Sequence, residues 1–388
     1  MTYKPSLLDF RARVLYFGVE ALDSQQMTLE DLGWNDRFEA DFATLYGKEW
    51  QPARLIRDNK ISYGALLGDG SELEVALGGA VYHEAKTDAE LPAVGDWVAL
   101  ELGEEGNEYD GVIRARLSRQ TCLSRKAPGK STEEQVMAAN VDVVFVVTDA
   151  GQDFNLRRME RYFTVMQRSG ARPVILLNKC DLYDEDSIRT ARDALLKLNS
   201  EAEVCVTSAL ESSGVRAVRH YITPGTTIAL IGSSGVGKSS LINQLMGQEY
   251  LWTGEVNGVT GKGMHTTTAR ELLLLPEGGM LVDNPGIREV QMWTDARTLK
   301  ESFRDFDEIA AQCKFHDCKH GSDKGCAIRA ALEAGSLSQE RFISYLKLDF
   351  ELEKLEQRQK KRQLTISRRN RRELKEKSDK YQGRYRKR

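Results

Sequence analysis

Residues Gly232–Ser239 (GSSGVGKS) combine glycines with one lysine and one hydroxyl at the spacing of a phosphate-binding loop. Glycines let successive backbone N–H groups close on phosphate oxygens, and the positive end of a following helix adds to the attraction. We expect Lys238 to reach the β- and γ-phosphates, where its charge assists catalysis, and Ser239 to coordinate Mg²⁺. The apolar run Thr227–Gly232 predicts a strand and residues 240–246 predict a helix, which is the context that this loop requires.

A phosphate-binding loop selects a triphosphate without identifying its base, and a second motif supplies the base preference. Asn178–Asp181 (NKCD) directly follows the apolar run Val174–Leu177, which predicts a strand. The carboxylate of Asp181 can accept hydrogen bonds from both the N1–H and the 2-amino group of guanine, and adenine offers neither donor. Thr207–Ala209 (TSA) follows the next predicted strand. NKCD is a weak signal alone, but with TSA and the phosphate-binding loop it predicts a guanine-nucleotide site.

Two further segments are expected to meet magnesium and the γ-phosphate. Asp283–Gly286 (DNPG) ends another apolar run, so the Asp283 carboxylate can hold Mg²⁺ through water and the Gly286 N–H can meet the γ-phosphate. Residues 254–270, here called the switch segment, are glycine-rich and contain HTTT. One of its threonines is expected to close over Mg²⁺, and the sequence does not distinguish among them. The expected magnesium ligands are Ser239 and Asp283, with Thr266, Thr267 or Thr268.

One position bears on how hydrolysis is switched on. Many GTPases place a glutamine just after the DxxG glycine to orient the attacking water, but here that residue is Ile287, which has no donor or acceptor. The nearest candidate for this catalytic role is His265, since a neutral imidazole can accept a hydrogen bond from water. The alternative is that His265 only shapes the switch segment. We therefore expect slow hydrolysis by the isolated protein and stimulation when a partner orders this segment.

The residues expected to contact GTP are those of the three motifs together. They are Asn178, Lys179, Asp181, Thr207, Ser208, Ala209, Gly232, Ser233, Ser234, Gly235, Val236, Gly237, Lys238, Ser239, Ser240 and Gly286.

A second cluster has the composition of a metal site. Cys313-x4-Cys318-x-His320-x5-Cys326 places three thiols and one imidazole within 14 residues. Three sulfurs and one nitrogen suit tetrahedral Zn²⁺, and four protein ligands make a closed, structural site. His316 is the alternative imidazole ligand. We predict one structural zinc per chain.

The motifs run in an unusual order, because NKCD and TSA precede the phosphate-binding loop instead of following it. A site assembled from strand ends at one edge of a sheet survives this reordering, which moves only the termini. From Asn140, apolar runs such as Val141–Val147 alternate with helical stretches, which predicts a doubly wound α/β sheet. Short runs of period two between Trp50 and Leu117 predict a small antiparallel barrel, for which an OB-type barrel is one candidate.

Composition excludes some functions and indicates a partner. No run of about 18 apolar residues predicts a membrane span, and the first residues lack the pattern of a secretory signal, so we expect a cytoplasmic protein. The net charge of −3 divides unevenly: residues 358–388 contain 15 Lys/Arg and 3 Asp/Glu, a net +12, which leaves −15 on the rest. A concentrated basic tail indicates an anionic partner, with nucleic acid as the best fit. The alternative is a solvated tail without a dedicated partner.

Taken together, these motifs resemble the circularly permuted, small-ribosomal-subunit-dependent GTPases called RsgA or YjeQ. The resemblance covers roughly residues 50–350 and rests on the permuted order, GSSGVGKSSLIN, GMHTTT, DNPGI, the Cys/His spacing, VGDWV and RKAPGK…QVMAANVD. It implies an OB barrel, a permuted GTPase domain, a zinc subdomain and a role in late maturation of the small ribosomal subunit. GSDKGC before Cys326 departs from the acidic-Pro pair more usual in the family, which concerns only the shape of the loop.

The predicted organisation has five segments. They are an N-terminal extension (1–48), an OB-fold barrel (49–128), a circularly permuted GTPase domain (129–296), a zinc-binding helical subdomain (297–350) and a basic C-terminal helix and tail (351–388). The expected partners of this monomer are GTP or GDP, the small ribosomal subunit and its rRNA, with no membrane. A P-loop kinase is disfavoured by NKCD and the switch threonines. An RNA-binding module that keeps guanine nucleotide only as a structural ligand would be excluded by GTP turnover.

Overall fold

The computed structural model describes most of the chain. The described residues are 27–45, 49–104, 106–127, 133–210, 212–247, 270–283, 298–299, 303–316, 318, 320, 323–355, 357–358 and 360. They fall into two compact units, one within residues 1–125 and 134–292 and the other within 126–133 and 293–388. Within these described ranges, no helix is long and apolar enough to cross a membrane.

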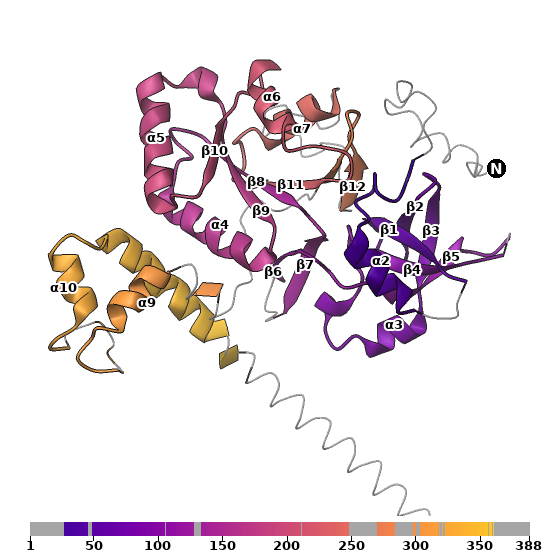
Figure 1. Cartoon of the computed structure of the whole chain (residues 1–388), viewed down its shortest axis with the longest axis horizontal. Helices are drawn as coiled ribbons and strands as arrows, with labels where there is room; N and C mark the ends of the chain where they lie inside the picture. The colour runs from indigo at the N-terminus through magenta and orange to yellow at the C-terminus, as the bar shows by residue number, and fades with distance from the viewer. Residues whose placement is uncertain are drawn as a thin grey trace, which may run out of the picture. The chain divides into compact units, whose positions relative to one another are not determined.

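A closed five-stranded barrel, drawn in indigo and purple in Figure 1, occupies the N-terminal part of the first unit. Its strands are β1 (Gln51–Asp58), β2 (Tyr63–Leu67), β3 (Glu72–Leu77), β4 (Trp97–Leu102) and β5 (Gly111–Arg116). The short helices α3 (Gly79–Glu84) and η2 (Asp88–Glu90) lie between β3 and β4. Buried side chains such as Leu55, Val75 and Ile113 fill the interior.

The prediction of an antiparallel barrel is wrong for one strand pair. β1 pairs antiparallel with β2 and β4, and β2–β3 and β4–β5 are also antiparallel, but β3 and β5 run parallel. The reason is parity, since a closed ring with an odd number of strands cannot alternate in direction all the way round. Strand β2 departs from the period-two pattern, because all five of its residues are buried.

A mostly parallel sheet follows the barrel along the chain. Its parallel strands run in the order β10 (Glu203–Val206), β9 (Arg172–Leu177), β8 (Val143–Thr148), β11 (Thr227–Gly232) and β13 (Met280–Asp283). Helices α4 (Leu156–Ser169) and α5 (Glu185–Leu198) pack on one face, and α6 (Ser212–Arg219) and α7 (Lys238–Met246) on the other (Figure 1). Every residue of β8 and β11 is buried, as expected for strands covered on both faces.

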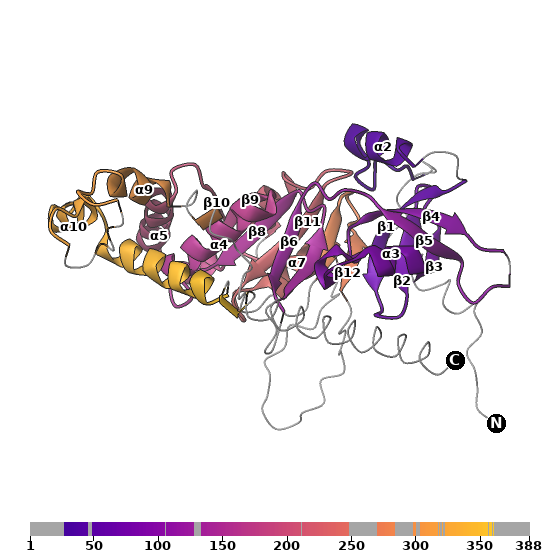
Figure 2. The ribbon, with the colours of Figure 1, turned by 90° about the horizontal axis from the view of Figure 1, so that it is seen from below.

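The barrel and the parallel sheet are continuous. β12 (Glu271–Leu274) pairs antiparallel with β13 on one side and with β1 of the barrel on the other. Figures 1 and 2 both place β12 against the barrel strands. One apolar core joins Ile56 and Trp97 of the barrel to Leu272 and Val282 of the sheet. The barrel therefore has little freedom to rotate against the sheet.

Residues ahead of the barrel belong to the same core. Helix α2 (Asp36–Ala43) begins at Asn35, whose side chain accepts hydrogen bonds from the first turn. The ring of Trp34 meets Trp97 edge-on at a centroid distance of 4.7 Å, and Phe38 is also buried. This part of the predicted N-terminal extension is thus packed against the barrel.

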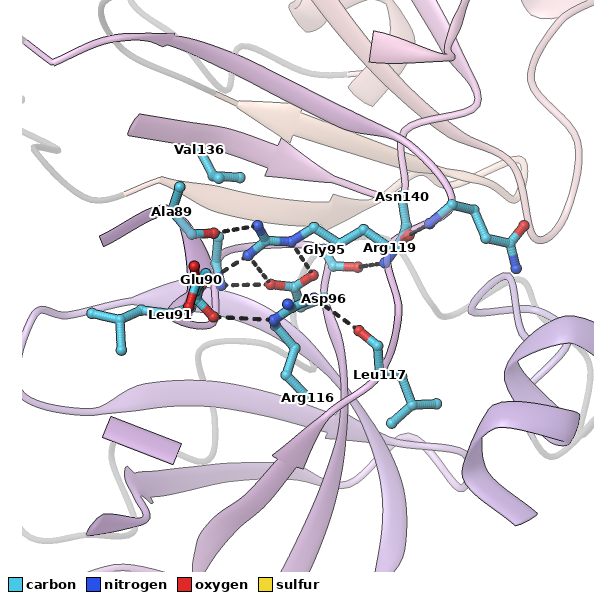
Figure 3. A network of polar contacts seen from close by, with 12 residues as sticks. Ala89, Glu90, Leu91, Gly95, Asp96, Arg116, Leu117, Arg119, Val136 and Asn140 are labelled. Carbon is cyan, nitrogen blue, oxygen red and sulfur yellow. Dashed lines mark hydrogen bonds and ion pairs between the residues drawn. The ribbon is translucent and has the colours of Figure 1, made fainter. Parts of the chain in front are cut away.

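An ion pair between Asp96 and Arg119 connects the segment ahead of β4 to the segment that follows β5 (Figure 3). Asp96 is fully buried, and the guanidinium of Arg119 donates to both of its carboxylate oxygens, at 2.8 and 2.7 Å. The same guanidinium donates to the carbonyls of Ala89 at 2.6 Å and Leu91 at 2.8 Å, and the N–H of Ala93 donates to Asp96 at 2.8 Å. The two charges are therefore paired and well hydrogen-bonded, as burial requires.

Asn140 follows the hairpin formed by β6 (Cys122–Lys126) and β7 (Glu134–Ala139) and precedes strand β8. With a left-handed φ of 54°, its amide donates to the carbonyl of Gly95 at 3.0 Å and accepts from the N–H of Gln120 at 2.9 Å. Its carbonyl accepts from Arg54 at 2.9 Å. Burial lowers the pKa of Arg54 to about 10, although two nearby carboxylates oppose the shift.

The second unit is helical. Its described elements are α9 (Arg304–Ala310), α10 (Ala327–Glu333) and a helix over residues 339–355. The rings of Phe306 and Phe342 stack at 6.0 Å, and Tyr345 stacks on Phe306 at 5.5 Å. Arg341 lies over the Phe306 ring at 5.2 Å and pairs with Asp305. This aromatic cluster is the core against which the cysteines pack.

Candidate functional site

The predicted nucleotide motifs all lie at the carboxyl ends of adjacent parallel strands. Asn178 follows β9, Thr207 follows β10, the phosphate-binding loop follows β11, and Asp283 ends β13. The strand ends are level, since Thr148 at the end of β8 is opposite Leu177 of β9. Ligands of open α/β sheets bind at this edge. The permuted motifs therefore converge in space although they are reordered in sequence.

The phosphate-binding loop has the expected strand–loop–helix context. β11 ends at Gly232, and α7 begins at Lys238. The ammonium of Lys238 donates to the carbonyls of Gly232 at 2.8 Å and Ser233 at 2.5 Å, so it lies over the loop. The first N–H groups of α7 have no partner within a helix and are available to an anion. This arrangement suits the polyphosphate of a nucleotide.

Asn178 joins the NKCD motif to the phosphate-binding loop. Its side chain is almost fully buried, with 1% exposed. Its amide N–H donates to the carbonyl of Val236 at 2.8 Å, and its amide oxygen accepts from the hydroxyl of Thr207 at 3.2 Å. Gly237 lies against the same amide: it has φ of 97°, and a Cβ there would lie 2.3 Å from Asn178 Nδ2. Three motifs separated in sequence are thus connected through one side chain.

Asp181 is held in place while remaining exposed. The hydroxyl of Ser208 donates to its carboxylate at 2.6 Å, and the backbone N–H of Cys180 donates to the carbonyl of Thr207 at 3.1 Å. Lys179 adopts a left-handed φ of 60°, which turns the chain between β9 and Asp181. The Asp181 carboxylate therefore has a fixed position and a free approach from solvent, as hydrogen bonding to a base requires.

One supporting residue was not predicted from the sequence. Gly214 of α6 lies so close to Ser208 that a Cβ there would be 2.4 Å from the Ser208 N. Its place at the start of a helix is unusual for glycine, and that is the only sequence signal that could have indicated it.

Several predicted residues lie outside the described part of the chain. They are Gly286, the candidate catalytic residue His265, and the switch threonines Thr266, Thr267 and Thr268. Ser239 in the first turn of α7 and Asp283 at the end of the neighbouring strand β13 are described, and both fit a magnesium site beside the phosphates.

The four predicted metal ligands come together in the second unit. One ligand atom from each of Cys313, Cys318, His320 and Cys326 lies within 4.8 Å of all the others. The His320 Nδ1 is 3.6 Å from the sulfurs of both Cys313 and Cys326, which matches the separation of about 3.6 Å between a nitrogen and a sulfur bound tetrahedrally to one zinc. His316 is exposed and is not part of the cluster.

The electrostatics of the cluster also fit a cation. Backbone N–H groups of Ala327 and His320 donate to the sulfurs of Cys313 and Cys318, both at 3.4 Å. The His320 N–H lowers the pKa of the Cys318 thiol, but desolvation and the Cys326 and Cys313 sulfurs outweigh it and raise this pKa to about 11. Three neighbouring thiols cannot all ionise unless a cation compensates their charge, so the donor set suits a soft divalent metal.

The fold and the site together define a circularly permuted P-loop GTPase. The family model described as RsgA GTPase matches residues 116–293, and the one described as 50S ribosome-binding GTPase matches residues 227–366. The second match begins at β11, where a GTPase of ordinary motif order would begin.

Comparison with whole proteins identifies the family. The chain is 43% identical to the "Small ribosomal subunit biogenesis GTPase RsgA" of Opitutus terrae, over 84% of this chain and 90% of that protein. It is 41% identical to the protein of the same name from Syntrophotalea carbinolica, over 83% and 88%. The chain belongs to the RsgA family of GTPases.

Solved structures agree with this fold. The crystal structure of YjeQ from Thermotoga maritima is 26% identical, covers 78% of this chain and 98% of its own, and superimposes with a TM-score of 0.57. YloQ, titled a circularly permuted GTPase, is 20% identical, with 80% and 97% covered and a TM-score of 0.54, which supports the fold alone.

Proposed function

We propose that this protein docks on the small ribosomal subunit in the cytoplasm and hydrolyses GTP to time its own release during late maturation of the subunit. The observation that carries the proposal is the Asn178 side chain, which connects the guanine-recognition motif to the phosphate-binding loop. The names of the relatives supply the partner. Membership of a GTPase family argues against an RNA-binding module that never turns over its nucleotide.

The described residues would perform distinct parts of the reaction. Asp181, held by Ser208, accepts the guanine N1–H and 2-amino group. The backbone of the phosphate-binding loop and Lys238 bind the β- and γ-phosphates and stabilise the charge that develops in transfer to water. Ser239 and Asp283 would hold Mg²⁺, which neutralises charge on the phosphate oxygens.

The switch segment would complete the site. We propose that one of Thr266, Thr267 and Thr268 reaches Mg²⁺, that the N–H of Gly286 meets the γ-phosphate, and that His265 aligns the attacking water. Ile287 offers no donor or acceptor for this task. Docking on the subunit would order the segment and raise the rate.

The remaining parts would serve structure and binding. Cys313, Cys318, His320 and Cys326 would hold one structural Zn²⁺ beside the aromatic core of the second unit. The barrel and the tail over residues 358–388 would contact rRNA, chiefly through its phosphates. The protein would act as a monomer.

Co-sedimentation tests the partner. The protein, saturated with a non-hydrolysable GTP analogue or with GDP, is centrifuged with purified small or large ribosomal subunits. We expect it to pellet with small subunits in the analogue-bound state and to be released with GDP. Binding to large subunits alone, or binding that does not depend on the nucleotide, would contradict the proposal.

Two variants test the details. Deletion of residues 358–388 should weaken binding and flatten its salt dependence, because each Lys/Arg–phosphate contact releases counterions. His265→Ala should keep GTP and subunit binding but lose most of the stimulation. An unchanged salt slope would assign the tail to solvent, and full stimulation would transfer the role of His265 to the subunit or another switch residue.

A further inference from the structure

Three residues lie side by side across the boundary between the barrel and the GTPase sheet. Arg57 of β1 is the register partner of Glu271 of β12, and Glu271 is the register partner of Asp283 of β13. Asp283 is the residue proposed above to hold Mg²⁺. A single row of adjacent backbone positions therefore leads from the barrel to the nucleotide site.

Side-chain contacts reinforce this row. The Arg57 guanidinium donates from Nε to Glu271 at 3.0 Å and pairs through Nη1 with Glu72 of β3 at 2.9 Å. The side chains of Arg57, Glu271 and Glu72 are each about one-quarter exposed, at 27%, 26% and 24% respectively. The guanidinium thus has one carboxylate partner inside the barrel and one on the GTPase sheet. Partial burial strengthens such pairs relative to fully exposed ones.

A β-bulge in β1 lies directly before Arg57. The β1–β2 register shifts between Leu55, which is opposite Ala65, and Arg57, which is opposite Gly64. Ile56 is the additional residue of this bulge and is buried in the core that barrel and sheet share. Bulges redirect side chains and are common beside functional sites.

The tip of the turn that joins β1 to β2 is exposed. β1 ends one residue after Arg57, and the turn that follows carries Lys60 with φ of 70° and Ile61 with 81% of its surface exposed. The loop between the first two strands is one of the ligand-contacting loops of OB-type barrels. The exposed residues 59–61 of this turn therefore lie just beyond the strand that carries Arg57, at the place where OB-type barrels contact their ligands.

The start of β12 is held on a second side. Arg270, the last residue of the predicted switch segment, donates from Nη1 to the carbonyl of Val136 in β7 at 2.7 Å. Glu271 follows it directly and is held by Arg57. Displacement of β1 would therefore move the end of the switch segment and the neighbour of Asp283 together.

We propose that the Arg57–Glu271 pair is a positioning link, through which RNA contacts at residues 59–62 alter the placement of Asp283 and of the end of the switch segment. The link rests on the proposed function for its partner, the rRNA of the small subunit. Coupling between the binding of two ligands is reciprocal, so RNA contacts that favour one nucleotide-bound placement of Asp283 require that nucleotide to favour the matching state of the turn at residues 59–62.

The two carboxylates that share Arg57 provide a matched comparison. Glu271→Gln weakens the contact that crosses to the GTPase sheet, whereas Glu72→Gln weakens the contact that stays within the barrel. Arg57→Met removes both. We expect Glu271→Gln and Arg57→Met to lower the kcat stimulated by small subunits at least about fivefold, a loss of about 1 kcal/mol in transition-state stabilisation. Unstimulated kcat, the KM for GTP and the Kd for the subunit should stay within about twofold, and Glu72→Gln should resemble wild type in every respect.

A second readout does not depend on stimulation. Amide hydrogen exchange at residues 59–62 is compared in free protein bound to GDP and to a non-hydrolysable GTP analogue. Wild type and Glu72→Gln should show a difference between the two nucleotides, and Glu271→Gln should lose it. Thermal unfolding of each variant checks that the fold is intact.

The outcomes separate the link from the proposed function. Equal loss of stimulation in Glu72→Gln and Glu271→Gln would overturn the link, because Arg57 would then only stabilise the barrel. Wild-type protein that small subunits do not stimulate would overturn the proposed function, and hydrogen exchange would still decide the link. If residues 59–62 of the wild-type protein exchange equally with both nucleotides, the link would be overturned.

Discussion

Gly237→Ala tests whether the contact between the two nucleotide motifs is as close as the structure indicates. The new methyl group would lie 2.3 Å from Asn178 Nδ2, well inside van der Waals contact, and the residue would keep φ of 97°. Asn178 would have to move away from Val236, to which it now donates at 2.8 Å. The substitution therefore separates the NKCD motif from the phosphate-binding loop without removing a side chain from either motif.

Gly235→Ala is the matched control for backbone strain. Gly235 is in the same loop with φ of 83°, but nothing lies within 4 Å of a Cβ built there. Each alanine costs about 1–2 kcal/mol for a left-handed backbone. Gly237→Ala should cost about 1–3 kcal/mol more, the usual penalty for a buried polar group that loses its hydrogen bond. That difference corresponds to roughly 2–12 °C in the unfolding midpoint of a unit of this size.

Thermal unfolding without nucleotide is the appropriate assay, because a bound phosphate would itself meet a methyl group at either position. Asn178→Ala should relieve the clash, so the double variant with Gly237→Ala should lose less stability than the sum of the single variants. Equal unfolding midpoints for Gly235→Ala and Gly237→Ala, or strict additivity with Asn178→Ala, would refute the contact.

Three further substitutions address the junction, the metal and the base. Arg119→Met should lower the free energy of unfolding of the first unit by about 3–5 kcal/mol in urea titrations followed by tryptophan fluorescence, because it leaves the buried Asp96 carboxylate unpaired. Cys318→Ser should abolish bound zinc, expected at about one per chain by metal analysis, and leave GTP affinity unchanged, since the nucleotide motifs lie in the other unit. Asp181→Asn should shift binding from guanosine to xanthosine nucleotides in competition assays, since an amide can donate to the xanthine 2-oxygen.

Each of these has a result that would count against it. Arg172→Met, which removes an exposed partner of Glu203, should cost less than about 1 kcal/mol, and an equal cost for Arg119→Met would contradict the buried-pair argument. Zinc retained by Cys318→Ser would exclude this cysteine as a ligand. An unchanged base preference in Asp181→Asn would show that another group recognises guanine.

Much of the GTPase sheet could be predicted from the sequence because its strands are buried on both faces. The continuous apolar runs of β8 and β11 were visible for that reason, and the motifs at their ends have characteristic spacing. The cysteine cluster was predictable because its ligands are close in sequence. In these parts, the local sequence pattern is enough to predict the structure.

The junction could not be predicted because its contacts connect distant parts of the chain. Arg57 and Glu271 are separated by 214 residues, and the β12 strand that joins them has only four residues. Trp34 packs on Trp97 from a segment predicted as a mere extension. Charged residues such as Arg119 and Asp96 ordinarily indicate surface, and only the fold reveals that Asp96 is fully buried beside an Arg119 side chain that is only 11% exposed.

Turnover of GTP, measured with and without purified small ribosomal subunits and with ATP as the control nucleotide, tests most directly whether this GTPase depends on the small subunit. We expect slow hydrolysis of GTP by the isolated protein, a marked rise in kcat with small subunits, and negligible turnover of ATP in both conditions. Equal rates for ATP and GTP, or a GTP rate that small subunits leave unchanged, would contradict this expectation.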